Sequence, residues 1–279
     1  MALEPLHVPS LLKRFGLSPR KSLGQNFLVD HNALVKIVSD AGIGPEDRVL
    51  EIGAGLGSLT RLLADRAKSV TAIEIDENLF PALESVIQPF DNVRLIKGDI
   101  LDIPPRSLFS ENGYQVVANI PYYITSAVIR HLLEAEVMPE QITLTIQREV
   151  AERIISKDAK MSLLSLSVLV YGRPRIARHI PPECFYPRPQ VESSVLMIAI
   201  DPEPKLSMEE IRWLFRLAHA AFNQKRKMLR NSLKPALPDG EASISSVLTD
   251  AGIDPRKRPE VLSLEDWIQL TRTAVKHFE

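Results

Sequence analysis

The chain has 279 residues, which is enough for two domains of ordinary size or for a large domain with a smaller one. Its content of 45% hydrophobic and 25% charged residues excludes a disordered or fibrous protein. No apolar run reaches the ~20 residues that span a bilayer, the N-terminus lacks a signal-peptide pattern, and the net charge is −1. Any affinity for nucleic acid must therefore come from local clusters of charge.

A single cysteine, Cys184, excludes an internal disulfide and a multi-cysteine zinc site. One free cysteine is typical of a protein in a reducing compartment, so we expect a cytoplasmic location. We also expect no bound metal and no association with a membrane. Nothing in the sequence requires a dimer, so we expect a monomer.

The first thirty residues are rich in turn-forming residues and locally basic. No acid lies between Glu4 and Asp30, whereas this stretch holds Lys13, Arg14, Arg20 and Lys21. Asp30 then has the character of a helix N-cap, and Gly42 that of the residue that ends this helix.

The middle of the chain alternates short segments rich in Val and Ile with helical stretches such as Ser58–Arg66 and Asn78–Ile87. The predicted strands are Arg48–Ile52, Ser69–Ile75, Val93–Lys97, Tyr114–Ile120 and Gln141–Ile146. This alternation predicts βαβ units, hence an α/β fold with a Rossmann-like parallel sheet and helices on both faces. A later apolar run, Ser194–Ile200, is expected to complete the sheet at or near an edge.

The pattern becomes purely helical after a proline-rich linker, Asp201–Lys205. Ser207 and Glu210 form a predicted capping box, and Ser263 is expected to begin the last helix. We therefore expect a first domain over residues 1–203 and a small all-helical domain over residues 204–279.

A glycine-rich turn follows the first predicted strand in Val49–Gly57. Gly53, Gly55 and Gly57 allow a tight turn and let a ligand approach the backbone without meeting a Cβ atom. The pattern G-x-G-x-G after Glu51 favours a nucleotide-like ligand, but a tight connection without any ligand has the same pattern.

Two further acids stand at strand ends. Glu74 ends the second strand, where a carboxylate can accept hydrogen bonds from both ribose hydroxyls of a nucleoside, and Asp99 follows the third, within reach of an adenine amine. With Glu51, three acids at the ends of successive strands are expected to line one crevice. They predict a nucleoside cofactor and leave open whether it is NAD or S-adenosylmethionine.

The fourth strand runs into Asn119-Ile-Pro-Tyr122, which is similar to the (D/N/S)-x-P-(Y/F) motif of amino-methyltransferases. An adenine amine is a weak nucleophile, because its lone pair is delocalised into the ring. The Asn119 oxygen and a backbone carbonyl held by Pro121 can accept its two hydrogens and free the lone pair, while Tyr122 offers a stacking face for an extruded base. The segment thus favours S-adenosylmethionine as the cofactor, with S-adenosylhomocysteine as product.

Over nearly its whole length the chain resembles the bacterial small-subunit (16S) ribosomal RNA adenine dimethyltransferases of the kasugamycin-sensitivity class, which have a class I methyltransferase domain. Ala54 and Ile120 depart from the proline and leucine that are frequent there, without removing a polar group. Beyond the motifs above, the matching segments are Ser22–Leu28, Phe185–Ser193, Ala221–Lys227, Arg230–Leu233, Gly252–Pro255 and Arg258–Glu260.

The resemblance implies N6-dimethylation of two adjacent adenosines near the 3′ end of small-subunit RNA during ribosome biogenesis, with the immature 30S subunit as partner. It implies that Phe185 faces Tyr122 across the flipped adenine, so the expected catalytic residues are Asn119, Pro121, Tyr122 and Phe185. The expected cofactor-binding residues are Gln25, Asn26, Leu28, Glu51, Gly53, Gly55, Glu74, Asp99 and Asn119.

The helical domain carries seven Lys or Arg and no acid between Arg212 and Lys234. Such a stretch favours binding to phosphates, although charge runs are often only solvated faces. The expected RNA-binding residues are Arg216, Asn223, Lys225, Arg226, Lys227 and Arg230, with Arg173, Arg175 and Arg178 as an extension.

Three alternatives remain. A large-subunit adenine methyltransferase of the macrolide-resistance type shares the glycine loop and Asn119–Tyr122. A non-catalytic assembly or nucleic-acid-binding factor would share the fold, but the intact Glu74, Asp99 and Asn119 argue against it. A NAD-dependent oxidoreductase would leave Asn119–Tyr122 unexplained.

Overall fold

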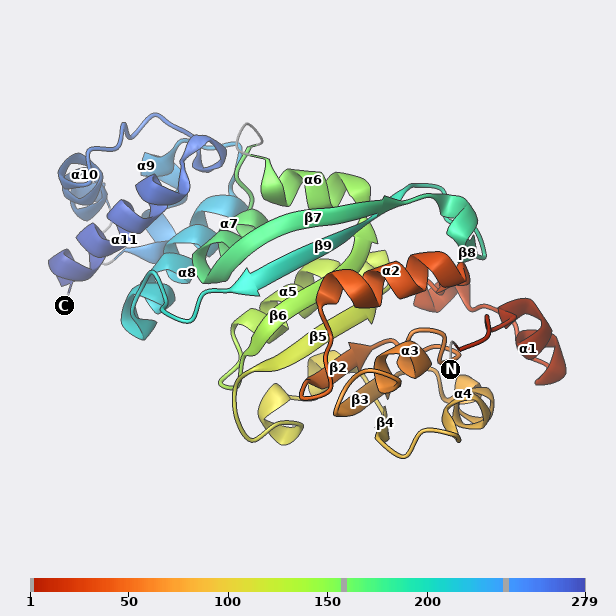
Figure 1. Cartoon of the computed structure of the whole chain (residues 1–279). Helices are drawn as coiled ribbons and strands as arrows, with labels where there is room; N and C mark the ends of the chain where they lie inside the picture. Colours follow the sequence, from red (N-terminus) through yellow and green to blue (C-terminus); the bar gives the residue numbers. More distant parts are fainter. Residues whose placement is uncertain (1–2, 157–159, 238–240, 279) are drawn as a thin grey trace. The chain divides into compact units, whose positions relative to one another are not determined.

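The computed structural model describes residues 3–156, 160–237 and 241–278 and forms two compact units (Figure 1). The first unit contains Met1–Ile155 and Arg173–Ile200, and the second contains Ser156–Gly172 and Asp201–Glu279. The boundary therefore differs from the expected division between residues 203 and 204, because Ser156–Gly172 belongs to the same unit as the C-terminal helices.

The first unit is built on a seven-stranded sheet in the order β4-β3-β2-β5-β6-β9-β7. Strands β2 to β6 are parallel to one another, and β9 is antiparallel to β6, so the predicted α/β class is confirmed. Chain order reverses between β2 and β5, which is where ligands bind in such sheets. The strands are β2 (Arg48–Ile52), β3 (Ser69–Glu74), β4 (Val93–Lys97), β5 (Tyr114–Asn119), β6 (Pro139–Gln147), β7 (Gly172–Ile180) and β9 (Ser193–Ile200).

Strand β7 was not predicted. It is one of the two edge strands, opposite β4, so β9 lies one position inside that edge. Its sequence holds three arginines and Pro174, a composition that a sheet tolerates at an edge and not at its centre. Arg178, expected to extend an RNA surface, instead makes a bidentate ion pair with Asp40 of α2.

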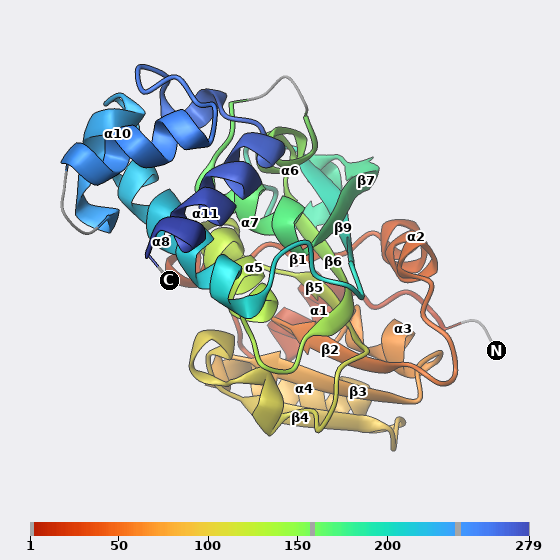
Figure 2. The same cartoon turned by 90° about the vertical axis from the view of Figure 1, so that its left-hand side faces the viewer.

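Helices cover both faces of this sheet, and Figure 2 shows α5 (Thr125–Leu133) and α2 (His31–Ala41) on opposite sides. With α2, helices α3 (Thr60–Ala64) and α4 (Phe80–Ile87) enclose a large apolar core. Helix α6 is Arg148–Ile155. The predicted caps of α2 are confirmed: the Asp30 carboxylate accepts from the Ala33 N–H, and Gly42 adopts the left-handed conformation.

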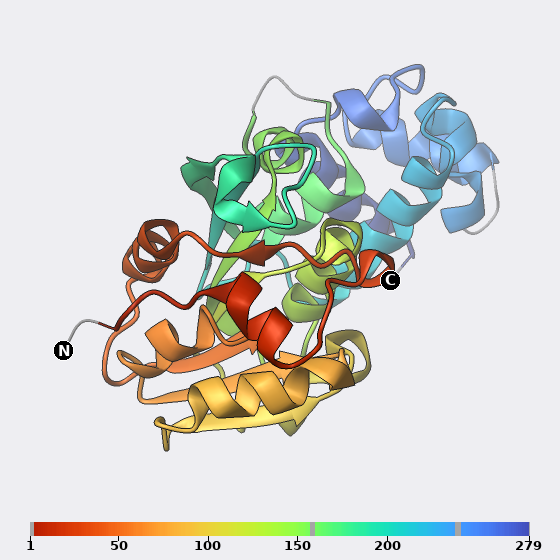
Figure 3. The same ribbon diagram turned by 90° about the vertical axis from the view of Figure 1, so that its right-hand side faces the viewer.

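The N-terminal segment has more structure than its turn-rich composition suggests. It forms α1 (Val8–Arg14), a 3-10 turn (Lys21–Leu23) and β1 (Phe27–Leu28), which pairs with β8 (Phe185–Tyr186). Figure 3 shows this red segment lying across the strands. The N-terminal segment packs against the glycine loop and the start of α4 through a separate apolar cluster, which includes Phe27, Leu56 and Leu79.

The second unit is helical, as expected. It contains α7 (Leu163–Tyr171), α8 (Met208–Asn223), α9 (Leu229–Ser232), α10 (Glu241–Asp250) and α11 (Leu264–Phe278). The Ser207–Glu210 capping box of α8 is confirmed, and Ser263 exchanges hydrogen bonds with Asp266 at the start of α11. Within the described ranges, no helix combines the length and apolarity that a membrane span needs, and no cluster of side chains fit for a metal ion is found.

Candidate active site

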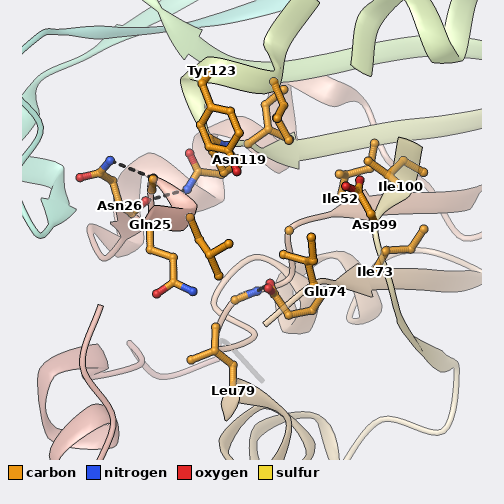
Figure 4. Close-up of a pocket in the computed structure, with 18 of the residues that line it drawn as sticks. Gln25, Asn26, Ile52, Ile73, Glu74, Leu79, Asp99, Ile100, Asn119 and Tyr123 are labelled. Atoms are coloured by element: carbon orange, nitrogen blue, oxygen red, sulfur yellow. Dashed lines mark hydrogen bonds between the residues drawn. The ribbon is translucent and has the colours of Figure 1, made fainter. Parts of the chain in front are cut away.

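The main pocket of the first unit lies at the carboxyl ends of β2, β3, β4 and β5 and is closed on one side by the N-terminal segment. Figure 4 shows Gln25 and Asn26 across this pocket from Asp99 and Ile100. It brings together most of the residues that the sequence singles out. These are Gln25, Asn26, Gly53, Gly55, Glu74, Asp99, Asn119, Pro121 and Tyr122.

The glycine loop leaves space where side chains would stand. Gly53 and Gly55 have φ values of 76° and 59°, which L-residues rarely adopt. A Cβ atom on Gly55 would lie 3.2 Å from the Phe27 ring, so the N-terminal segment also requires glycine here. The loop therefore presents bare backbone to the pocket.

Glu74 joins this loop to the end of β3. One carboxylate oxygen accepts from the Gly55 N–H at 2.7 Å, and the other accepts from the Asp76 N–H at 2.8 Å. Burial raises the pKa of Glu74, and these backbone bonds oppose that rise. Each carboxylate oxygen has a second lone pair, so Glu74 retains the capacity to accept hydroxyl groups of a ligand.

Glu51 does not line the main pocket, which corrects the expectation of three acids in one crevice. Successive side chains of a strand point to opposite faces, so Ile52 lines the main pocket while Glu51 lines a smaller cavity beside it. The small cavity also contains Leu28 and shares Gly53, Gly55 and Asn119 with the main one.

The Glu51 carboxyl is 1% exposed, and its Oε2 atom has no hydrogen-bond partner among the residues that the structure describes. Burial raises its pKa to about 8, the Thr60 hydroxyl opposes this rise, and the Glu74 charge adds to it. A buried, unpartnered carboxyl is costly unless a ligand satisfies it, so this cavity suits a cationic hydrogen-bond donor.

The Asn119 side chain is hydrogen-bonded to the backbone of the N-terminal segment. Its Nδ2 atom donates to the Asn26 carbonyl at 3.1 Å, as drawn in Figure 4. Because only the amide nitrogen can donate to a carbonyl, this bond fixes the side-chain orientation and leaves Oδ1 as an acceptor. Pro121 follows in an extended conformation, with φ −56° and ψ 136°.

The Tyr122 ring is fixed at its hydroxyl, which lies 2.7 Å from the Ser193 Oγ atom at the start of β9. Burial raises the pKa of Tyr122, so the phenol stays neutral. Sequence reasoning did not foresee this bond, nor the place of Tyr123. The Tyr123 side chain lines the pocket, is 67% exposed and lies close to Gly24.

Phe185 lies elsewhere. It is 4% exposed, belongs to the apolar core of the first unit and is paired with Leu28 through β8 and β1. It is not among the residues that line the main pocket. The stacking of a base between Tyr122 and Phe185 stays a prediction, and this geometry gives it no support.

The basic residues of the second unit are exposed on and after α8. Arg216 lies over the Trp213 ring at 4.8 Å, and the exposed residues that follow are Asn223, Lys225, Arg226, Lys227 and Arg230. Backbone bonds from Leu229 to Lys257 and from Arg230 to Pro255 bring a second basic run, residues 256–258, beside α9. Sequence reasoning missed this run because about thirty residues separate it from the first.

Known proteins share both the sequence and the fold. The family model for ribosomal RNA adenine dimethylase matches residues 16–274. A ribosomal RNA small subunit methyltransferase A from Dehalococcoides mccartyi is 42% identical over 93% of this chain and 90% of its own length. The protein of that name from Moorella thermoacetica is also 42% identical, over 95% of each chain.

Two solved structures resemble most of the chain. The 23S rRNA methyltransferase ErmE is 28% identical, with a TM-score of 0.70 over 90% of this chain and 100% of its own. A dimethyladenosine transferase from Plasmodium falciparum is 24% identical, with a TM-score of 0.73 over 86% of this chain and 94% of its own, and shares the fold. The family model covers almost all of the chain, so the protein belongs to the ribosomal RNA adenine dimethylase family.

Proposed function

We propose that this protein transfers methyl groups from S-adenosylmethionine to N6 of two adjacent adenosines near the 3′ end of small-subunit ribosomal RNA, and dimethylates each during assembly of the subunit in the cytoplasm. The observation that carries the proposal is Asn119-Ile-Pro-Tyr122 at the edge of a pocket fit for a nucleoside. The two relatives at 42% identity bear a small-subunit name, which favours that RNA.

The pocket suits S-adenosylmethionine, because it combines bare glycine backbone with acids at separate strand ends. Glu74 would accept the ribose hydroxyls, and Asp99 would accept from the adenine amine of the cofactor. Gln25, Asn26 and Leu28 would cover the cofactor from the N-terminal segment, beside the backbone of Gly53 and Gly55. The unpartnered Glu51 suits the ammonium group of the methionine part.

The chain positions the target amine and needs no strong base. When bound, S-adenosylmethionine supplies a methyl group on a sulfonium, which is a good leaving group. Asn119 Oδ1 and the carbonyl beside Pro121 would accept the two amine hydrogens, which directs the nitrogen lone pair away from the ring. Tyr122, with its hydroxyl held by Ser193, would stack on the flipped base.

Replacing Glu51 by glutamine should remove a pH dependence of cofactor binding. The pKa of Glu51 is raised to about 8, so the native carboxyl keeps its proton below that pH and cannot attract a cation. A bound ammonium favours the carboxylate, so affinity should rise by up to about tenfold per pH unit as the pH approaches 8 from below, and level off above it. Calorimetry of S-adenosylhomocysteine with both proteins separates this effect from the titration of the ligand. Parallel pH profiles would contradict the role of Glu51.

Ser193→Ala and Tyr122→Phe each remove one side of the same hydrogen bond. Each should lower kcat by roughly three- to tenfold with little change in KM for the cofactor, because the ring keeps its stacking face but loses its orientation. The double variant should be no slower than the single ones. Ser194→Ala is the matched control, since Ser194 bonds His179 and not Tyr122. Additive effects on kcat would show that the two side chains act separately.

One assay tests the proposed function against its alternatives. The protein is incubated with radiolabelled S-adenosylmethionine and with immature small subunits or large subunits that lack the modification. Label in small-subunit RNA is expected. Label only in large-subunit RNA would favour the function of ErmE, which this chain resembles in fold and sequence. No label in either subunit would favour a non-catalytic assembly factor.

A further inference from the structure

Asp76 lies just beyond β3, two residues after Glu74, and is 2% exposed. It receives local hydrogen bonds from the Asn78 backbone and side chain, as a cap does. It also receives two bonds from far along the chain. Arg20 donates to Oδ1 at 3.1 Å, and the Gln25 amide donates to Oδ2 at 2.8 Å.

Through hydrogen bonds Asp76 contacts two residues that line the cofactor pocket, Glu74 and Gln25. The Asp76 backbone N–H donates to Glu74 Oε1, and the side chain holds Gln25, which lines the pocket. Gln25 Oε1 in turn accepts from the Arg20 N–H at 2.8 Å, so the amide has its donor and its acceptor both engaged. Asp76 is thus bonded both to the carboxylate proposed for the ribose and to the segment that closes the pocket.

The other attachments of the N-terminal segment do not fix Gln25. The apolar cluster holds Phe27 and the residues of α1, and the Asn26 carbonyl is bonded to Asn119. These attachments would remain if the Asp76 side chain changed. Loss of the Asp76 bonds should therefore leave the segment attached but free the Arg20 side chain and release Gln25 from the pocket wall.

We infer that Asp76 is a positioning residue for the cofactor: through Gln25 and Arg20 it holds residues 20–25 of the N-terminal segment against the pocket in register with Glu74. The inference rests on the proposed function, because it takes the pocket as the S-adenosylmethionine site. It concerns cofactor affinity, whereas the target amine is positioned by Asn119.

An exchange of the Asp76 carboxylate and the Gln25 amide tests the inference. In Asp76→Asn, the new amide N–H group faces the N–H group of the Gln25 amide. In Gln25→Glu, two carboxylates face each other. Each variant should weaken binding of S-adenosylhomocysteine roughly tenfold. The double variant D76N/Q25E restores one donor facing one acceptor with the same net charge. It should bind S-adenosylhomocysteine more tightly than either single variant, even though Gln25 itself lines the pocket. KM for S-adenosylmethionine should rise in the two single variants and fall again in the double variant, while kcat stays nearly constant.

A second readout needs no cofactor. Trypsin cleavage after Arg20 and Lys21 should be faster in each single variant and return to the original rate in D76N/Q25E. Glu46→Gln is the matched control, because Glu46 is an exposed carboxylate whose partner is Lys68. Unchanged affinity and cleavage in the single variants, or an additive loss of affinity in the exchanged pair, would overturn the inference. Failure of the original protein to bind S-adenosylhomocysteine would instead overturn the proposed function.

Discussion

Replacing Asn119 by alanine should lower the rate of methyl transfer by at least about a hundredfold, the usual effect of removing one well-placed hydrogen-bonding group from an active site. The Asn119 amide nitrogen is already bonded to the Asn26 carbonyl, so the side chain enters the reaction with its oxygen oriented. Without that oxygen the amine keeps its lone pair in the ring. Single-turnover kinetics with saturating cofactor and RNA measures the decrease directly.

Binding of RNA should be nearly unchanged in Asn119→Ala, because the basic residues lie in the other unit. Asn32→Ala, on the exposed surface of α2, is a control for the loss of an asparagine. Near-normal turnover in Asn119→Ala would refute the role of its oxygen in freeing the lone pair.

Replacing Lys225, Arg226 and Lys227 together by alanine should weaken RNA binding on the order of a hundredfold at physiological salt. The plot of log affinity against log salt concentration should also flatten by about one unit for each phosphate that is no longer neutralised. The three side chains are exposed, and the second basic run beside α9 adds positive charge to the same unit. Binding isotherms of small-subunit RNA at several salt concentrations give both quantities.

A matched control removes three positive charges that already face acids of the first unit. Lys68, Lys97 and Arg106 are paired with Glu46, Glu77 and Glu136. K68A/K97A/R106A should leave the salt slope unchanged. An unchanged slope in the variant of residues 225–227 would identify those residues as a merely solvated surface. Cofactor affinity, measured alongside, should be the same in all these proteins.

The parallel strands were predictable because each is a short Val- and Ile-rich run next to a helix with clear end signals, such as Asp30 and Gly42. Helix α7 is buried on nearly all sides, so its apolar residues do not recur at helical spacing. The sequence therefore did not show that α7 belongs to the helical unit. Strand β7 was hidden by its arginines, which only an edge position accommodates.

The candidate site was predictable where it depends on strand ends. Glu74, Asp99 and Asn119 meet because the carboxyl ends of parallel strands share one edge. The sequence did not show that Glu51 lines a smaller cavity beside the main pocket, which follows because one residue along a strand reverses the side-chain direction. The bonds from Asp76 to Gln25 and from Tyr122 to Ser193 join residues more than fifty positions apart, and only the folded chain shows them.

The most direct test of the central claim is the identity of the methylated atom. Small-subunit RNA methylated by this protein is digested to nucleosides and analysed by mass spectrometry against authentic standards. The geometry of Asn119, Pro121 and Tyr122 predicts methylation at N6 of adenine, and membership of the dimethylase family predicts N6,N6-dimethyladenosine; Asn119→Ala should produce neither. Methyl groups found on a ring carbon, on a ribose hydroxyl or on a base other than adenine would contradict it.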